Sequence, residues 1–276
     1  MCDLLGLSFS TDISARISLD IFQDRGRVNP DGWGMAFYYD KSLRIIKEAQ
    51  SALNSPLFDF MERYIHSKTI ISHVRRSTRG IPSYLNTHPF YREMNIGHTR
   101  QEYSFAHNGT LTNLARLSTL NCKPLGETDS ELAFCYIIET IQNRGIQNWT
   151  EGDYAFLENT CRDINDDENT FNCMLSNGEL LFCYSDENDH NNGLRYLCQK
   201  QPFGTIELIS PDEKLGAIDI HTATPTDSLA ENELGYVIST RILTEGDWTE
   251  FRGGELIVFR NGEIVYPSHR VTQSSS

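Results

Sequence analysis

Residues 171–185 read FNCMLSNGELLFCYS, two apolar runs separated by Asn177-Gly178. An Asn-Gly pair between apolar runs is the strongest short-range signal for a β-hairpin. The same pattern returns at residues 255–266, ELIVFRNGEIVY, around Asn261-Gly262. Both segments predict antiparallel strand pairs in the second half of the chain.

The remaining elements come in blocks of strands and blocks of helices. The expected strands are Leu4–Ser8, Trp33–Tyr39, Thr69–Arg75 and Tyr103–His107, the last of them broken by Asn108-Gly109. The expected helices run from Ser55-Pro56 to about His66, from Thr128 or Asp129 to about Asn143 before Gly145, and over Thr150–Asn165. Such blocks favour an α+β fold with antiparallel sheets. Residues 185–192 are expected to form a surface loop. We expect one domain over residues 1–270 and a flexible tail at 271–276.

Composition limits the classes of function. The 276 residues are 39% apolar and 22% charged, as in an ordinary globular protein, and the net charge is −14. That charge argues against nucleic acid or an anionic membrane as the main partner, because both select clustered Lys and Arg. No signal peptide and no apolar run near the ~20 residues of a membrane span is present. A cytoplasmic location is therefore expected.

The cysteines suggest free thiols. There are seven, at positions 2, 122, 135, 161, 173, 183 and 198. An odd number with irregular spacing and no CxxC pair suits a reducing compartment, where most of them would fill the core. No four-ligand zinc pattern occurs, so we expect neither a metal nor another cofactor, and a redox or metal protein is the least favoured alternative.

Cys2 is the strongest candidate for a reactive residue in this sequence. Removal of Met1 would leave one residue with both a thiol and a free α-amine. The amine has a reference pKa of about 7.7–8.0, so it is partly neutral at physiological pH. It can therefore act as a general base on its own side chain without a catalytic histidine. By position alone such a cysteine is uninformative, and its interpretation depends on the segments that follow.

Three segments carry side chains with suitable chemistry. Arg75 ends an expected strand, where it can form a bidentate pair with a carboxylate or belong only to a solvated basic loop. Asn108 and Gly109 can offer two N–H donors to one developing oxyanion or form only a hairpin turn. Asp129 can face a substrate ammonium or only cap the helix that follows.

Two further features are ambiguous. In Asn29-Pro30-Asp31-Gly32-Trp33-Gly34, two glycines around a tryptophan permit a close backbone approach near a ligand, or mark a plain turn into a strand. His88 and His107 are candidate general bases, but a hydrogen-bonded structural histidine is the favoured interpretation of each.

Together these segments resemble a known family. Cys2 is followed by DGWG (31–34), SHVRRSTRG (72–80), NTHPF (86–90), AHNGTLTN (106–113) and GETDSE (126–131). This is the order found in class-II glutamine amidotransferases, which are N-terminal-nucleophile hydrolases. The chain is most similar to their stand-alone, YafJ-like branch. Each motif is weak alone, but these five in register after a cysteine at position 2 form a specific signal.

The resemblance implies a fold and a catalytic group. The fold is a four-layer αββα sandwich, two antiparallel sheets between helical layers. Cys2 would be the nucleophile and its α-amine the base, and Asn108 and Gly109 would form the oxyanion hole.

The resemblance also implies a substrate site. Arg75, helped by Thr78, would hold the α-carboxylate of glutamine, and Asp129 would hold the α-ammonium. Arg76 and Arg79 stand where synthase-linked members of the family have Trp and His, which bears on the size of the substrate.

The expected activity is therefore that of a cysteine amidohydrolase or glutamine amidotransferase. Cys2 would attack the γ-amide of glutamine or of another γ-glutamyl compound and form a γ-glutamyl thioester. No synthase domain follows in the sequence, so an ammonia-accepting or peptidase partner protein stays an open expectation. The alternative is a non-catalytic binding or scaffold subunit that keeps the fold.

Cys2 is predicted to be the only cysteine that activity requires. Cys2→Ala should abolish glutamate release from glutamine or γ-glutamyl amides, whereas the matched variants Cys122→Ala and Cys198→Ala should keep it, because only Cys2 carries its own base. A glutamine-like electrophile should label Cys2 alone in a peptide map. An active Cys2→Ala protein would contradict the assignment of the nucleophile.

Overall fold

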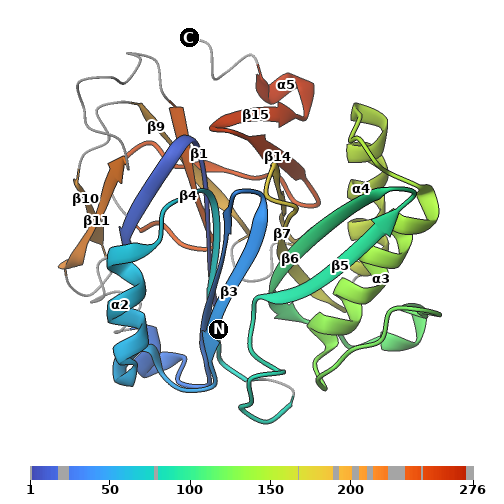
Figure 1. Ribbon diagram of the computed structural model, residues 1–276, viewed down its shortest axis with the longest axis horizontal. Coiled ribbons are helices and arrows are strands. Elements are labelled where there is room, and N and C mark those ends of the chain that lie inside the picture. The colour runs from blue at the N-terminus through green and yellow to red at the C-terminus, as the bar shows by residue number, and fades with distance from the viewer. Residues whose placement is uncertain are drawn as a thin grey trace.

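The computed structural model describes residues 2–17, 25–77, 80–166, 168–188, 193–200, 205–209, 214–222, 234–243 and 245–271. Two antiparallel sheets pack face to face, with helices on the outer face of each, so the expected αββα sandwich is confirmed (Figure 1). Among the described residues, no helix combines the length and the apolar character that crossing a membrane requires.

The larger sheet contains the strand that follows Cys2. Its order is β13-β9-β12-β1-β4-β2-β3, and β11 pairs with both β1 and β10. The strands are β1 (Asp3–Ile17), β2 (Trp33–Tyr39), β3 (Ser42–Glu48), β4 (Ser67–Val74), β9 (Arg195–Lys200), β10 (Thr205–Ile209), β11 (Lys214–Thr222), β12 (Leu234–Ser239) and β13 (Thr249–Glu250). Because β1 lies between β4 and β12, its first residues are hydrogen-bonded on both sides.

The second sheet has the order β15-β14-β8-β7-β6-β5. Its strands are β5 (Phe90–Ile96), β6 (Thr99–Thr110), β7 (Thr170–Ser176), β8 (Leu180–Tyr184), β14 (Leu256–Arg260) and β15 (Glu263–Tyr266). Both Asn-Gly hairpins predicted from the sequence are confirmed, as β7–β8 and β14–β15. At the second turn Asn261 and Gly262 have φ of 47° and 78°, the left-handed values that a two-residue hairpin requires.

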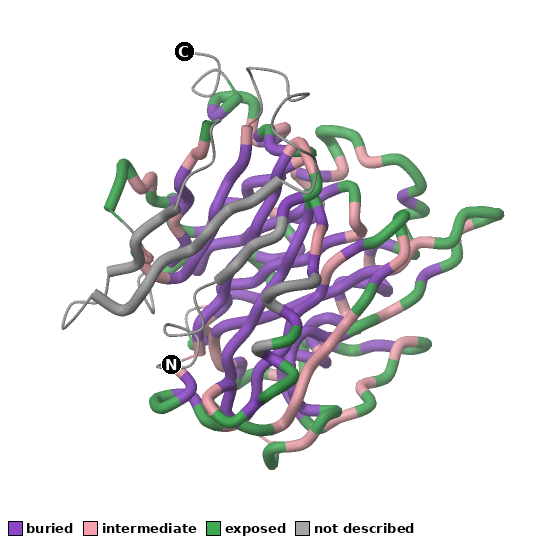
Figure 2. The backbone as a smooth tube through the Cα atoms, turned by 60° about the vertical axis from the view of Figure 1, so that its left-hand side comes forward, coloured by how far each residue is buried: buried purple, intermediate pink, exposed green. Residues whose placement is uncertain are grey.

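Helices cover the two outer faces. They are α2 (Pro56–Tyr64) on the larger sheet, α3 (Asp129–Arg144) and α4 (Glu151–Ile164) on the second, the short α5 (Ser268–Val271), and the 3₁₀ turns η1 (Ala52–Asn54) and η2 (Leu114–Arg116). Separate apolar cores lie beneath α2, beneath α3 and α4, and between the sheets. Figure 2 shows these buried residues as continuous stretches along the central strands.

Two expectations about local structure were wrong. Asn108 and Gly109 do not break a strand, because both lie inside β6 and pair with Asn172 and Phe171 of β7. The segment from residue 185 does not begin as a surface loop, since Ser185 and Asp186 are buried. Asp186 Oδ2 accepts hydrogen bonds from Phe171 N at 2.7 Å and from Asn165 Nδ2 at 3.1 Å. Residues 189–192 of the expected loop lie outside the described residues.

The layer between the sheets is apolar except at one end. Leu4 and Ile71 belong to it, and His73 is the direct cross-strand partner of Leu4, so the His73 ring points into the same layer. His73 lies against His88, with ring centroids 4.3 Å apart. Burial lowers the pKa of His73 to about 3, and the nearby positive charge of Arg75 acts in the same direction. The fold therefore holds His73 in its neutral form.

This burial predicts a pH-dependent stability. In the unfolded chain His73 takes up a proton as the pH falls through its ordinary value of 6.5, whereas in the folded protein it stays neutral down to about 3. The neutral His73 therefore contributes fully to the free energy of unfolding above pH 6.5. This contribution falls by about 1.4 kcal/mol per pH unit between pH 6.5 and about 3. Urea unfolding at pH 7, 6 and 5 should show this loss in the wild type and a shallower one in His73→Phe. Equal slopes would show that His73 titrates alike in both states.

Candidate functional site

Asp3, the residue that follows Cys2, holds the start of β1 in place. The buried carboxylate of Asp3 accepts hydrogen bonds from Arg25 Nε at 2.7 Å, Arg241 Nε at 2.7 Å and Asn29 Nδ2 at 3.0 Å. These donors come from segments before β2 and after β12. The position of Cys2 is therefore set by two segments that lie far apart in the sequence.

The end of β12 adds a second attachment. Leu4 N donates to Thr240 Oγ1 at 3.2 Å, and Leu4 O accepts from Thr240 N at 3.3 Å and from Ser239 Oγ at 3.1 Å. Every backbone polar group of Leu4 is thus bound to Ser239 or Thr240, at the end of β12. A strand end held in this way has little freedom to fray.

The Asp31–Gly34 turn positions the arginine segment. Arg75 N donates to Gly32 O at 2.7 Å and Asp31 N donates to Arg75 O at 3.1 Å. Asp31 Oδ2 also accepts from Ser77 N at 2.7 Å. A Cβ on Gly34 would collide with the carbonyl oxygen of His88. These glycines therefore allow the turn to pack closely against neighbouring segments of the chain.

The Cys2 thiol lies against the backbone of Arg76. Cys2 Sγ accepts from Arg76 N at 3.1 Å and lies 3.3 Å from Arg76 O, to which it donates. Burial raises the pKa of the thiol, while the Arg76 N–H and the charge of Arg75 oppose this effect. The thiol is therefore protonated at neutral pH and needs a base before it can act as a nucleophile.

Asn108 and Gly109 reach the site from the second sheet. Asn108 Nδ2 donates to the carbonyl oxygen of Cys2 at 2.6 Å, a direct link between the sheets. A Cβ on Gly109 would collide with the carbonyl oxygen of Thr170 on the adjacent strand. Glycine at this position is thus required by strand packing and not by a turn.

Asp129 is not the cap of its helix. Thr128 is the N-cap of α3, with its hydroxyl accepting from Glu131 N at 3.2 Å. Asp129 is buried at the first position of the helix, and its Oδ2 accepts from Leu111 N at 2.6 Å. Its charge is close enough to act on Arg75. The interpretation of Asp129 as only a helix cap is therefore wrong.

His107 has the structural role that the sequence favoured. Its Nε2 lies 3.0 Å from Thr170 O and its Nδ1 lies 2.8 Å from Ser130 Oγ. Because a carbonyl only accepts, Nε2 carries the proton and Nδ1 accepts from Ser130. Burial lowers the pKa of His107, so the ring is neutral and both nitrogens are occupied.

A small cavity of about 20 Å³ brings these parts together. It is lined by Cys2, Arg75, Arg76, His88, His107, Gly109, Thr128, Asp129 and Ser130. Four of the six residues expected at the site line it, and Asn108 joins them through Cys2. Thr78, the sixth, and Arg79 lie outside the described residues. Sequence reasoning missed Asp3 and Ser130, although each is adjacent to a residue that it had selected.

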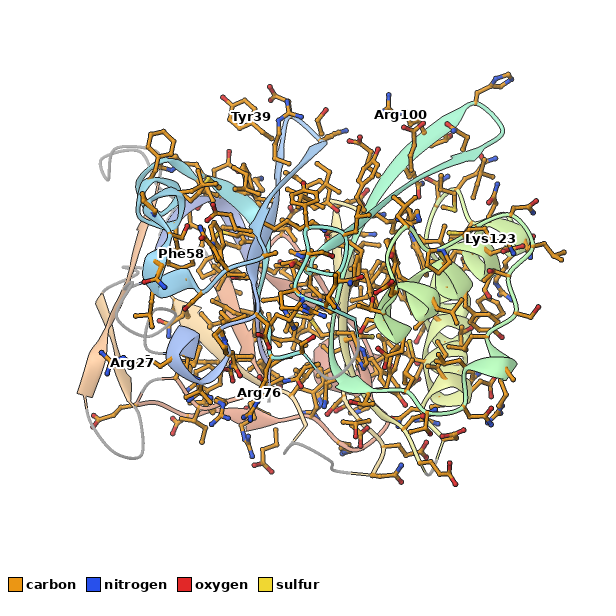
Figure 3. All side chains as sticks on the ribbon, turned by 90° about the horizontal axis from the view of Figure 1, so that it is seen from below. Arg27, Tyr39, Phe58, Arg76, Arg100 and Lys123 are labelled. Carbon is orange, nitrogen blue, oxygen red and sulfur yellow. The ribbon has the colours of Figure 1, made fainter. Side chains whose placement is uncertain are left out.

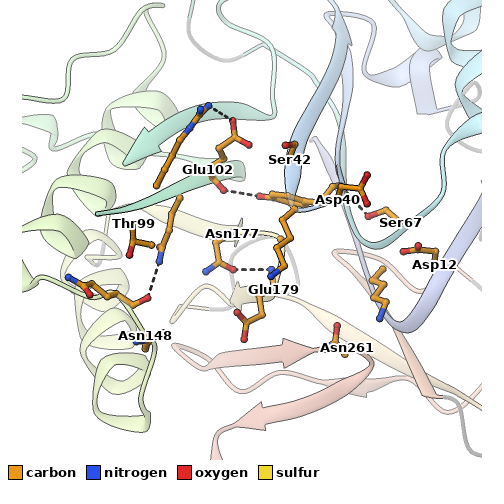
Figure 4. A pocket seen from close by; sticks show the side chains of 17 residues that line it. Asp12, Asp40, Ser42, Ser67, Thr99, Glu102, Asn148, Asn177, Glu179 and Asn261 are labelled. Carbon is orange, nitrogen blue, oxygen red and sulfur yellow. Dashed lines mark hydrogen bonds and ion pairs between the residues drawn. The ribbon is translucent and has the colours of Figure 1, made fainter. Parts of the chain in front are cut away.

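A much larger cleft, of about 820 Å³, lies at the opposite end of the sandwich. Ser67 and Arg100 border it near the starts of β4 and β6, whereas Cys2 lies near the ends of these strands, roughly 25 Å away along β4. Figure 3 shows Arg100 and Arg76 on opposite sides of the molecule. The cleft is lined mainly by polar side chains of loops and strand ends, as Figure 4 shows. Size alone would therefore select the other end of the molecule, because Cys2 lies at the small cavity.

Comparisons with known proteins agree with the geometry. A family model described as glutamine amidotransferases class-II matches residues 1–276. The uncharacterized protein MJ1515 of Methanocaldococcus jannaschii is 38% identical, over 99% of this chain and 73% of its own length. YafJ of Escherichia coli, a protein assigned to the glutamine amidotransferases, is 34% identical over 96% of this chain and 100% of its own.

Solved structures show the same similarity. A predicted glutamine amidotransferase from Pseudomonas aeruginosa superposes with a TM-score of 0.71 at 27% identity, covering 96% of this chain and 100% of the other. The glutamine phosphoribosylpyrophosphate amidotransferase from B. subtilis, at 13% identity and a TM-score of 0.56 over 95% of this chain and 48% of its own, shares the fold. The motifs around Cys2, the sandwich of two sheets and the match over residues 1–276 show that the chain belongs to the class-II glutamine amidotransferases.

Proposed function

We propose that this protein hydrolyses the γ-amide of glutamine, or of another γ-glutamyl compound, through a γ-glutamyl thioester on Cys2. The observation that carries the proposal is the single cavity shared by Cys2, Arg75 and Asp129. In this cavity the Cys2 thiol lies beside a cation and an anion, both buried. The α-carboxylate and the α-ammonium of a glutamyl group require this pair of charges.

The base in this proposal is the α-amine that removal of Met1 would expose on Cys2. Because burial raises the pKa of the thiol, a standing thiolate is disfavoured at neutral pH. His107 cannot replace the amine, since both of its ring nitrogens are hydrogen-bonded. The amine would take the thiol proton as sulfur attacks the amide carbon, and would then give that proton to the departing ammonia or amine.

The charged pair would orient the substrate. Arg75 would bind the α-carboxylate, with Thr78 assisting, and Asp129 would bind the α-ammonium. The Asp129 oxygen Oδ2 is held by Leu111 N, so the carboxylate is fixed in orientation before the substrate arrives. A preorganised pair lowers the entropic cost of orienting the substrate. Asn108 Nδ2 and the N–H of Gly109 would stabilise the oxyanion.

The direct test is glutamate release from glutamine and from a panel of γ-glutamyl amides, with Cys2→Ala as the matched control. Intact mass of the purified protein shows whether Met1 has been removed. A processed wild type that releases no glutamate from any of these compounds would favour a binding or scaffold subunit that keeps the fold. The ammonia released in this reaction could pass to an accepting partner protein. Alternatively, the chain could act together with a peptidase partner protein and release glutamate.

Asn108→Ala is expected to lower kcat by about 10²–10³ with little change in KM, because an oxyanion donor acts mainly in the transition state. Steady-state kinetics with glutamine provides the measurement. Asn113→Ala, which changes an exposed asparagine on the same segment, is the control. A rise in KM at constant kcat would assign Asn108 to substrate binding instead.

Arg75→Lys should keep the charge but lower kcat/KM for glutamine by about 10–100-fold, because an ammonium cannot reproduce the bidentate carboxylate pair. The loss should be much smaller for glutamine α-amide, which has no α-carboxylate. Arg76→Lys, with an exposed side chain, is the control and should be milder. If the wild type uses the α-amide as well as glutamine, then Arg75 does not bind an α-carboxylate.

A further inference from the structure

His88 is a buried polar residue at the cavity with no hydrogen bond. Its exposed fraction is 4% and that of His73, which lies against it, is 0%. Neither ring nitrogen of His88 has a hydrogen-bond partner among the residues that the structure describes. A buried polar atom without a partner costs about 1–3 kcal/mol, so such groups in a native protein call for an explanation.

The surroundings of His88 keep it neutral. Burial lowers its pKa well below the ordinary value, and the positive charges of Arg75 and Lys47 act in the same direction. Lys47 donates to Thr87 O at 2.6 Å and to Pro89 O at 3.1 Å, on either side of His88. A neutral imidazole has one N–H donor and one lone pair, so His88 can exchange hydrogen bonds with a small neutral molecule without taking its proton.

The cavity that His88 lines offers polar partners for such a molecule. A bound water needs two to four of them. The lining includes His88, Asp129 and Ser130 as well as Cys2. His73 lies against His88 and does not line the cavity, so the two histidines differ in access although both are buried.

We propose that His88 holds the water molecule that hydrolyses the γ-glutamyl thioester, an inference that rests on the proposed function. In this step the water oxygen bonds to the thioester carbon and one of its protons passes to the Cys2 amine. The carbon–sulfur bond breaks, the amine returns that proton to the departing sulfur, and the free γ-carboxyl of glutamate forms. His88 accepts a hydrogen bond from the other O–H of the water and remains neutral throughout. Its function is to orient the water's lone pair toward the thioester carbon.

The experiment separates the two half-reactions in the processed wild type, His88→Phe, His88→Leu and the control His73→Phe. Thioester formation is followed by intact mass after rapid acid quenching with glutamine as substrate, and its breakdown by glutamate release. His88→Phe should slow breakdown by about 10²-fold, as a misplaced reactant does, while formation stays near the wild-type rate. The thioester should therefore accumulate. Added hydroxylamine, which does not depend on the water position, should restore turnover as the hydroxamate.

The variants make the outcome decisive. His73→Phe removes an equally buried ring without touching the cavity, so its thioester should not accumulate. If His88→Phe is insoluble, His88→Leu, which is smaller and also lacks ring nitrogens, carries the same expectation. Normal thioester breakdown in a folded His88 variant, or an equal loss in both half-reactions, would overturn the proposal. A processed wild type that forms no thioester would instead refute the proposed function. The intact-mass measurement detects that outcome separately from the effect of the His88 variants.

Discussion

The site depends on the hydrogen bonds that the carboxylate of Asp3 accepts. Its two oxygens bind Arg25 and Arg241, which are partly exposed, and Asn29, which is fully buried. A buried carboxylate that lost one of these donors would retain the cost of desolvation without its compensation. The position of Cys2 is therefore set by the hydrogen bonds of its neighbour Asp3 as well as by the strand.

The sequence predicted those parts of the fold that local conformation determines. The strand expected over Trp33–Tyr39 is β2 without change, and both hairpin turns stand where Asn-Gly pairs occur. The same dipeptide failed at Asn108-Gly109, because glycine there is required by the neighbouring Thr170 carbonyl and not by a turn. No local pattern distinguishes these two uses of glycine. Several strands, among them β3 and β5, were not anticipated. Both lie at sheet edges, where polar residues blur the alternating pattern of a strand.

The sequence predicted those site residues whose charge or functional group alone indicates a role. Arg75 and Asp129 were selected as opposite charges, and the fold brings both to the Cys2 cavity. The pairing of Asn108 with the Cys2 carbonyl was not predictable, because it joins two sheets whose relative position no single strand determines. The same holds for His88, whose sequence context suggested a hydrogen-bonded residue. Only the packing of the sheets shows that its ring nitrogens have no partner.

The bond between Asp3 and Arg241 also has a consequence for biosynthesis. These residues are 238 positions apart, and β1 finds its neighbour β12 only after residues 234–239 have been synthesised. Contacts of such separation form late, since a long loop must close before they stabilise anything. On the ribosome the first strand therefore lacks this neighbour until that part of the chain has emerged. The hydrogen bonds around Asp3, and with them the position of Cys2, are complete only from that point on.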